Sequence, residues 1–334
     1  MTSAVRERSR LDVEQLAQLS ASLLISAIIG LASLVVFVAL PQQLKILRVI
    51  QKLGHPGVFA LIAICVISLL RRLPGAERNA WRDYLIAFVI CTLLGGATEI
   101  AQIYTHRDPA LADVALDARG AVCALLLLAA FDRRTWLRRS PSLSRGTYLV
   151  AFASLAVVML MPLVAALAAY VHRAQHFPVL FAADSARDLY FIEPVNSVTP
   201  LRVAAAARAS APAGPALLVP LVGAPYAGVE FAEPCPDWSG FHSLRIEVTN
   251  PGPQVLLLNV RVDDRGPQRA YGDRYDGQFR VEPGKREVLD VPLDTIASAP
   301  TGRRLNLKAI ARLILFRAGD AGPSAVLVHR IALQ

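Results

Sequence analysis

Residues 98–120 read TEIAQIYTHRDPALADVALDARG and place ionisable and amide side chains at the junction of two long apolar segments. Polar groups are costly next to the hydrocarbon core of a bilayer, so those found there usually have a function. The apolar residues on both sides are long enough for helices that cross a membrane. We therefore expect a functional site at one water-facing edge of a helix pair, with these side chains: Glu99, Gln102, Arg107, Asp113 and Asp117.

Apolar residues form 54% of the 334-residue chain, and they are concentrated before residue 172. A helix needs roughly 20 apolar residues to cross about 30 Å of hydrocarbon. Five segments are near this length: Ala21–Leu40, Gly54–Leu70, Tyr84–Tyr104, Asp113–Phe131 and Thr147–Val171. The first is too long for the core of a signal peptide and has no small-x-small cleavage site after it, so we interpret it as an uncleaved anchor. The sequence predicts a membrane all-α bundle of five transmembrane helices over residues 1–172 and a second domain over residues 173–334.

Lysine and arginine in short loops remain on the cytoplasmic side of a membrane. Twelve of the 17 basic residues in the first domain lie before the first span or in the connections after the second and fourth spans. The amino terminus is therefore predicted to be cytoplasmic, and the second domain periplasmic or extracellular, in a multi-pass protein of the bacterial inner membrane. The same loop residues account for most of the net charge of +9, so no nucleic-acid partner is expected, because such a partner needs a basic face on a soluble domain.

Polar residues at the outer ends of spans two, three and four are spaced three or four residues apart, which places them on one face of each helix. A simpler interpretation is that they are helix-end residues that reach the lipid head groups, with Asp113 as a cap. Lys52 or Arg107 alone fits that interpretation. The set favours a functional site, because Glu99 and Asp117 lie about one turn inside and a carboxylate is too short to reach the head groups. The set is Lys52, His55, Glu99, Gln102, Arg107, Asp113 and Asp117.

The order of these residues matches a family pattern: Lys52-x-x-His55, Glu99-x-x-Gln102, Arg107, Asp113, a polar residue four positions on, and Gly120. By this pattern the chain resembles the VanZ-like membrane proteins over roughly residues 20–132. These proteins are small helical bundles associated with low-level resistance to glycopeptide antibiotics. The chain departs from the pattern with Asp117 in place of a common Asn and Ala124 in place of a second Gly. The resemblance implies a role in the cell envelope and supplies no reaction.

Imidazole, carboxylate and basic side chains at the outer leaflet suit a phosphate-bearing lipid head group, because cations hold the anion and a carboxylate or imidazole moves protons. Whether the protein is an enzyme stays open, since the sequence has no GxSxG elbow, phosphate loop or HExxH motif. No cofactor and no metal are predicted, although the acidic residues with His55 or His106 are an alternative divalent-cation site. The four cysteines supply neither a disulfide framework nor a zinc set.

After Val171, short alternating segments with recurring prolines and glycines replace the long apolar ones, as in an all-β sandwich. Apolar and polar residues alternate in Ser243–Thr249, the pattern of a half-buried strand. Gln254–Val262 is a more continuous apolar run, which predicts an inner strand. Pro-Gly turns at residues 251–253 and 282–285 separate strands. We expect eight to ten strands in residues 173–334.

The order Trp238-x-x-Phe241-x-x-Leu244-x-Ile246, followed by Leu258-x-Val260-x-Val262-Asp263 and a Pro-Gly turn, resembles jelly-roll carbohydrate-binding and galactose-binding-like modules over roughly residues 180–334. Such modules stack sugar rings on aromatic side chains and hydrogen-bond the hydroxyls, so the resemblance implies a glycan site. Its candidate residues lie in loop-like sequence: Tyr226, Tyr271, Asp273, Arg274 and Tyr275. In the alternative, Trp238 is a core residue and the charged residues form a solvated hairpin tip or a structural calcium loop.

The sequence thus predicts a cell-envelope membrane protein that binds, and in one interpretation processes, a polyprenyl-linked or wall glycolipid or glycan at the outer leaflet. Membrane lipids, lipid-linked glycans and envelope polysaccharide are the expected partners. The alternative from another class is a non-catalytic anchor or partner subunit of an envelope polysaccharide synthesis or export complex. The ligand, the reaction and the oligomeric state stay open at this point.

Overall fold

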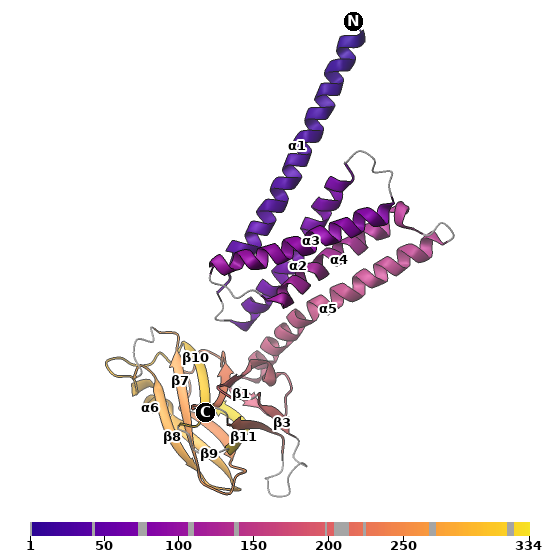
Figure 1. Ribbon diagram of the computed structural model, residues 1–334. Helices are drawn as coiled ribbons and strands as arrows, with labels where there is room; N and C mark the ends of the chain where they lie inside the picture. Colours follow the sequence, from indigo (N-terminus) through magenta and orange to yellow (C-terminus); the bar gives the residue numbers. More distant parts are fainter. Residues whose placement is uncertain are drawn as a thin grey trace. The chain divides into compact units, whose positions relative to one another are not determined.

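The structure is a computed structural model that describes residues 2–334 except 42–43, 73–78, 106–109, 137–139, 198, 204–213, 223–224, 267–271 and 319–323. For residues 2–17, 201 and 203 it describes the backbone alone. The chain divides into two compact units, Met1–Ala165 and Ala166–Gln334. Figure 1 shows helices in the first unit and mainly strands in the second.

The first unit is built from long helices (Figure 1). They are α1 Thr2–Phe37, α2 Lys45–Leu70, α3 Ala80–Gln102, α4 Leu111–Phe131 and most of α5 Pro141–His176, with the 3-10 turns η1 Ile103–Thr105 and η2 Arg133–Thr135. Among the described residues, five helices are long and apolar enough to cross a membrane, by length and composition. Each predicted apolar segment corresponds to one of them, so the predicted helical N-terminal region is confirmed.

Helices α2, α3 and α4 pack around a core of apolar and small side chains. Phe59 and Ile62 on α2 are fully buried, as are Cys91 on α3 and Ala121 on α4. Small residues allow the helices to come this close, which is the usual way in which helices pack in lipid.

Two glycines determine how closely these helices approach. A Cβ on Gly120 of α4 would overlap the carbonyl oxygen of Pro56 on α2 and lie 2.5 Å from its Cα. A Cβ on Gly95 of α3 would lie 3.1 Å from Oδ2 of Asp117 on α4. Gly96, by contrast, has no atom within 4 Å of the place where its Cβ would be. The contact between α2 and α4 therefore depends on the absence of a side chain at residue 120.

The second unit is an all-β sandwich of two antiparallel sheets, as predicted. One sheet has the strand order β3-β4-β11-β6-β9, with β1 also paired to β11, and the other has the order β2-β5-β10-β7-β8. The bounds are β1 Val179–Ala182, η3 Asp188–Phe191, β2 Ile192–Val195, β3 Leu201–Val203, β4 Ala216–Leu221, β5 Gly228–Ala232, β6 Ser243–Thr249, β7 Leu256–Asp264, β8 Tyr275–Val281, β9 Arg286–Pro292, α6 Leu293–Ser298, β10 Ile310–Phe316 and β11 Ser324–Leu333. The described residues hold eleven strands rather than eight to ten, because the short β1, β2 and β3 lie in sequence without clear alternation.

The sandwich core lies between the two sheets. Leu244, Ile246 and Val248 of β6 are fully buried, as their alternation with polar residues predicts. Trp238 is also fully buried, and its Nε1 donates a hydrogen bond to the carbonyl of Cys235 at 2.7 Å, so its interpretation as a core residue is confirmed. The apolar run of β7 is not buried on both faces, because Leu257 is 49% exposed.

The last turns of α5 belong to the second unit. The Arg173 guanidinium lies 3.2 Å from the centroid of the Phe191 ring and donates a hydrogen bond to the carbonyl of Ala232 at 3.0 Å. Nε2 of His172 lies 3.4 Å from Oδ1 of Asp188. These contacts fasten the end of the helix to η3 and to the end of β5.

Candidate functional sites

Three polar side chains from three helices meet inside the first unit. His55 comes from α2, Glu99 from the last turn of α3 and Asp117 from the second turn of α4. A ligand atom of each lies within 4.8 Å of the other two, and all three side chains are buried. They come together because the close contact at Gly120 brings α4 against α2, and because Gly95 leaves room for the Asp117 carboxylate. We call these three residues the polar cluster.

The polar cluster has few hydrogen bonds for its charge. Nδ1 of His55 lies 3.3 Å from Oδ1 of Asp117, and the backbone N–H of Ala110 donates to Oε2 of Glu99 at 2.9 Å. The remaining carboxylate oxygens, Oε1 of Glu99 and Oδ2 of Asp117, are buried and have no hydrogen-bond partner among the described residues. A buried carboxylate oxygen without a partner is costly. The arrangement therefore favours uptake of a proton or a cation.

The structure brings together only part of the predicted outer-edge set. Gln102 is buried, and its Nε2 donates to the carbonyl of Val35 on α1 at 3.4 Å. Lys52 is exposed and Asp113 is half-buried, and neither belongs to the polar cluster. Two residues lie outside the described part of the chain: His106 and Arg107.

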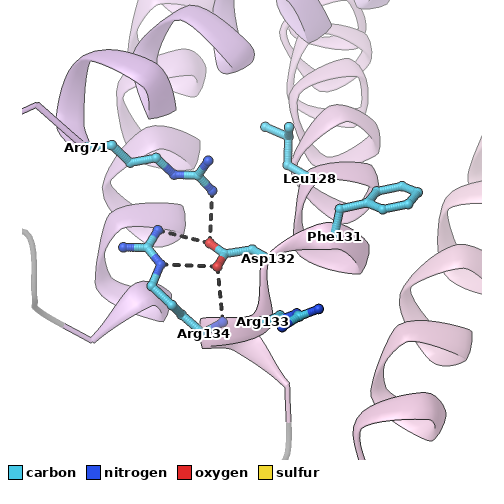
Figure 2. A pocket seen from close by; sticks show the side chains of 6 residues that line it. All are labelled: Arg71, Leu128, Phe131, Asp132, Arg133 and Arg134. Carbon is cyan, nitrogen blue, oxygen red and sulfur yellow. Dashed lines mark hydrogen bonds and ion pairs between the residues drawn. The ribbon is translucent and has the colours of Figure 1, made fainter.

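A second group of charges lies at the opposite end of α2 and α4. Asp132, which follows α4, accepts hydrogen bonds from Nη2 of Arg71 and from Nη2 of Arg134, both at 2.9 Å. Figure 2 shows these bonds and the other side chains that line the pocket around them, Leu128, Phe131 and Arg133. The pocket has a volume of about 400 Å³. Because the carboxylate holds two guanidinium groups, we interpret this group as a connection between helix ends. Sequence reasoning missed it, since it treats these arginines only as a topology signal.

Tyr275 does not lie in a loop, contrary to the sequence prediction. It is the first residue of β8, pairs with Val262 on β7 and is 7% exposed in the sandwich core. Its hydroxyl fits there because a Cβ on Gly277 would overlap it. Burial, together with the nearby Asp276 carboxylate, raises the pKa of Tyr275. The ring has no free face for a sugar, and Tyr271 lies outside the described residues.

The charged residues of the same segment form ion pairs within the sandwich. Asp273 pairs with Arg303, whose guanidinium also binds both carboxylate oxygens of Asp264, at 2.7 and 2.9 Å. Arg274 donates from Nε to Oδ2 of Asp276 at 2.8 Å. The partner of Asp273 is distant in sequence, so the segment is fastened to the rest of the sandwich by these charges.

Another surface of the sandwich combines aromatic and polar side chains. It is the side of the β2-β5-β10-β7-β8 sheet that faces away from the core, and we call it the outer face. Alternation along the paired strands presents there Glu193, Glu230, Asn259, Arg261, Asp276, Gln278, Ile314 and Phe316. Tyr226, just before β5, contacts Phe316 with ring centroids 6.0 Å apart and is 47% exposed.

Arg261 joins the aromatic and polar parts of the outer face. Its guanidinium lies 4.8 Å from the centroid of Phe316, and its Nε donates to Oδ1 of Asp276 at 2.9 Å. The side-chain amide of Gln278 donates to that of Asn259 at 3.4 Å. An exposed ring offers an apolar face, and the amide and carboxylate groups beside it offer donors and acceptors. Of the predicted glycan residues that the structure describes, only Tyr226 contributes an exposed ring to this surface.

No family model matches the chain, and no curated protein matches it. The resemblance of residues 20–132 to VanZ-like proteins therefore rests on its residue pattern alone.

Solved structures similar to this chain include three carbohydrate-binding modules. The family 11 module of Clostridium thermocellum, in complex with a β-1,3-1,4-mixed-linked tetrasaccharide, is 13% identical, with 46% of this chain and 93% of the module covered and a TM-score of 0.37. The CBM22-1 xylan-binding domain of Paenibacillus barcinonensis Xyn10C is 13% identical, with coverage of 46% and 94% and a TM-score of 0.32. A family 30 module of Clostridium thermocellum is 14% identical, with coverage of 43% and 86% and a TM-score of 0.30. Ligand binding by this chain therefore has to be argued from its own side chains.

Proposed function

We propose that this protein is a multi-pass membrane protein of the bacterial cell envelope whose sandwich lies outside the cytoplasm and binds a glycan. The observation that carries the proposal is the outer face, where an exposed tyrosine ring lies beside ordered polar side chains. Tyr226 has a left-handed backbone conformation, with φ of 62°. That conformation is costly for a residue with a side chain, and residues that adopt it cluster at ligand sites as well as in tight turns.

The Tyr226 ring is held in place before any ligand arrives. Phe316 contacts it from the sheet, and Phe316 is in turn covered by the Arg261 guanidinium. A side chain that is already ordered loses little conformational entropy on binding. The exposed part of the ring is thus suited to stacking on the apolar face of a sugar, and Asn259 and Gln278 are suited to its hydroxyl groups.

The helices of the first unit support a place in the membrane. Their outward side chains are large and apolar: Leu23 is 71% exposed, Leu93 69% and Ile100 64%. Soluble monomers rarely expose a contiguous apolar surface of this kind. The distribution of arginine in the loops supports a cytoplasmic amino terminus and an external sandwich.

For the helical unit, the proposal is binding of the polar head group of a lipid-linked glycan or wall glycolipid. The VanZ-like pattern of residues 20–132 supports this envelope role and the association with glycopeptide resistance. The polar cluster supports it as well, because it lies near the predicted outer ends of α2, α3 and α4.

Replacing Tyr226 with alanine is expected to weaken binding of the full-length protein to envelope polysaccharide about five- to tenfold, because stacking on one ring is worth on the order of 1 kcal/mol. Tyr226→Phe keeps the ring and should bind like the wild type. Alanine meets the same backbone strain as tyrosine, so thermal stability should hardly change. Affinity electrophoresis in detergent, against polysaccharide isolated from the producing bacterium and against soluble β-glucan and xylan, measures the difference.

Val288→Ala is the matched control, because Val288 is 43% exposed on β9 of the other sheet. It should leave retention unchanged. Equal retention of the Tyr226→Ala and wild-type proteins would place the glycan site elsewhere. Absence of wild-type retention on every polysaccharide would favour the anchor or partner-subunit alternative.

The proposed topology is tested with reporter fusions. Alkaline phosphatase fused after Gln334 should be active, because the sandwich is placed outside, whereas the same enzyme fused after Ser142 should be inactive. A green fluorescent protein series should give the opposite signals at both positions. An active phosphatase after Ser142 would contradict the orientation derived from the loop arginines.

A further inference from the structure

We infer that the polar cluster binds one divalent transition-metal ion, with His55, Glu99 and Asp117 as its protein ligands. The sequence spacing gives no metal motif, because each residue comes from a different helix. Such an ion would bind in the helical unit whether or not the sandwich binds a glycan.

The geometry of the polar cluster fits a metal ion. One nitrogen or oxygen atom of each side chain lies within 4.8 Å of those of the other two. Metal–ligand bonds of about 2.0–2.2 Å bring ligand atoms to roughly 3–4 Å from one another. Small side-chain rotations are therefore enough to close the cluster around an ion.

Two buried oxygens are available for such an ion. Glu99 is 3% exposed and Asp117 fully buried, and Oε1 of Glu99 and Oδ2 of Asp117 lack hydrogen-bond partners among the described residues. The backbone N–H of Ala110 holds the other oxygen of Glu99. A hydrogen bond to a metal-binding carboxylate fixes the orientation of that carboxylate, as in known metal sites. A cation bound by the polar cluster would compensate the buried charge of both carboxylates.

The ligand types indicate the class of metal. Calcium and magnesium prefer all-oxygen sites, whereas one imidazole with two carboxylates suits zinc, manganese, iron or cobalt. Three protein ligands leave a coordination position open, as in catalytic zinc sites, for water or for an oxygen of a bound anion. The chief rival is a proton shared between the carboxyl groups, which would also relieve the buried charge.

The test uses full-length protein purified in detergent, stripped with a chelator and titrated with Co²⁺, which reports its coordination by visible absorption. We expect one Co²⁺ per chain, displaced by Zn²⁺. Glu99→Gln and Asp117→Asn keep the side-chain size and remove the charge. Removing a group that only hydrogen-bonds a metal ligand weakens metal binding 10- to 100-fold in known sites. Removing a ligand itself should therefore weaken Co²⁺ binding about 100-fold or more.

Asp83→Asn is the matched control, because Asp83 is a buried carboxylate in the first turn of α3, at the opposite end of that helix from Glu99. It should bind Co²⁺ like the wild type. Thermal unfolding provides a second readout: Zn²⁺ should raise the melting temperature of the wild-type and Asp83→Asn proteins but not of the Glu99→Gln protein. If Glu99→Gln does not accumulate, Asp117→Asn and His55→Gln provide the same comparison.

Absence of saturable Co²⁺ binding by the wild type would overturn the metal site and support the shared proton. Equal Co²⁺ affinity of the wild-type and cluster variants would overturn it too, because the ion would then bind elsewhere. Neither result depends on glycan retention, so failure of the metal site and failure of the proposed function are distinguishable.

Discussion

Replacing Gly120 with alanine is expected to remove most of the folded helical unit. The added Cβ would lie 2.5 Å from Cα of Pro56 and overlap its carbonyl oxygen. Backbone atoms in a packed core do not move aside as the end of a side chain does, so α2 and α4 would have to separate. We expect a cost of about 3 kcal/mol. Size-exclusion chromatography and thermal unfolding in detergent would show it as less monodisperse protein and a lower melting temperature.

Gly96→Ala is the control for this substitution, since no atom lies within 4 Å of the added Cβ. Alanine favours a helix over glycine by up to about 1 kcal/mol, so this variant should be at least as stable as the wild type. A Gly120→Ala protein with wild-type stability would contradict the close contact between α2 and α4.

Among the substitutions proposed here that remove a charge from the sandwich, Arg303→Ala should destabilise it most. The Arg303 guanidinium binds both oxygens of Asp264, whose side chain is 1% exposed, and pairs with Asp273. Without it, a buried carboxylate loses its counter-charge, which costs on the order of 3 kcal/mol. Hydrogen–deuterium exchange of β7 and β10 in the full-length protein should become faster. Arg304→Ala is the matched control, because the partner of Arg304 is Asp294, which is 98% exposed; it should change little.

The same ion pair predicts an acid dependence. Burial alone would raise the pKa of Asp264, but the Arg303 guanidinium and the backbone N–H groups of Asn306 and Gly266 hold it below its ordinary value. The pKa of Asp264 is lower in the folded than in the unfolded protein. The ionised carboxylate therefore contributes fully to the free energy of unfolding above the unfolded pKa of about 3.9, and this contribution is lost as the pH falls through the folded pKa. The protection of the β7 amides, measured relative to their intrinsic exchange rates at each pH, should therefore fall below about pH 4, and less so in Arg303→Ala. If the protection of the β7 amides depended on pH equally in the wild-type and Arg303→Ala proteins, this role of Asp264 would be contradicted.

The sequence predicts the fold well where one periodicity dominates. The five apolar segments are helices because hydropathy and length agree, and β6 has the predicted faces because apolar and polar residues alternate without interruption. The prediction fails for Tyr275, where aspartate, arginine and glycine neighbours resemble a loop. Its inward position depends on space beside Gly277, and local sequence does not reveal that space.

The candidate site is predictable in outline only. Spacing places Lys52 and His55 on one helix face, yet His55 is buried and Lys52 is exposed, because the rotation of α2 against its neighbours decides which side chain reaches the interior. Asp273 has the composition of a ligand loop but pairs with Arg303, 30 residues later. Such pairings follow from the sheet arrangement and not from local spacing.

The position of β10 and β11 has a consequence for how the sandwich matures. They are the last strands in chain order, yet β10 lies between β5 and β7, and β11 between β4 and β6. The edges of those earlier strands have no partner until residues 310–333 have been synthesised, and open strand edges promote aggregation. The two sheets are therefore complete only after these last strands have been synthesised. That order would suit the external location proposed for the sandwich, because a chain that crosses a membrane through a translocation channel does so unfolded.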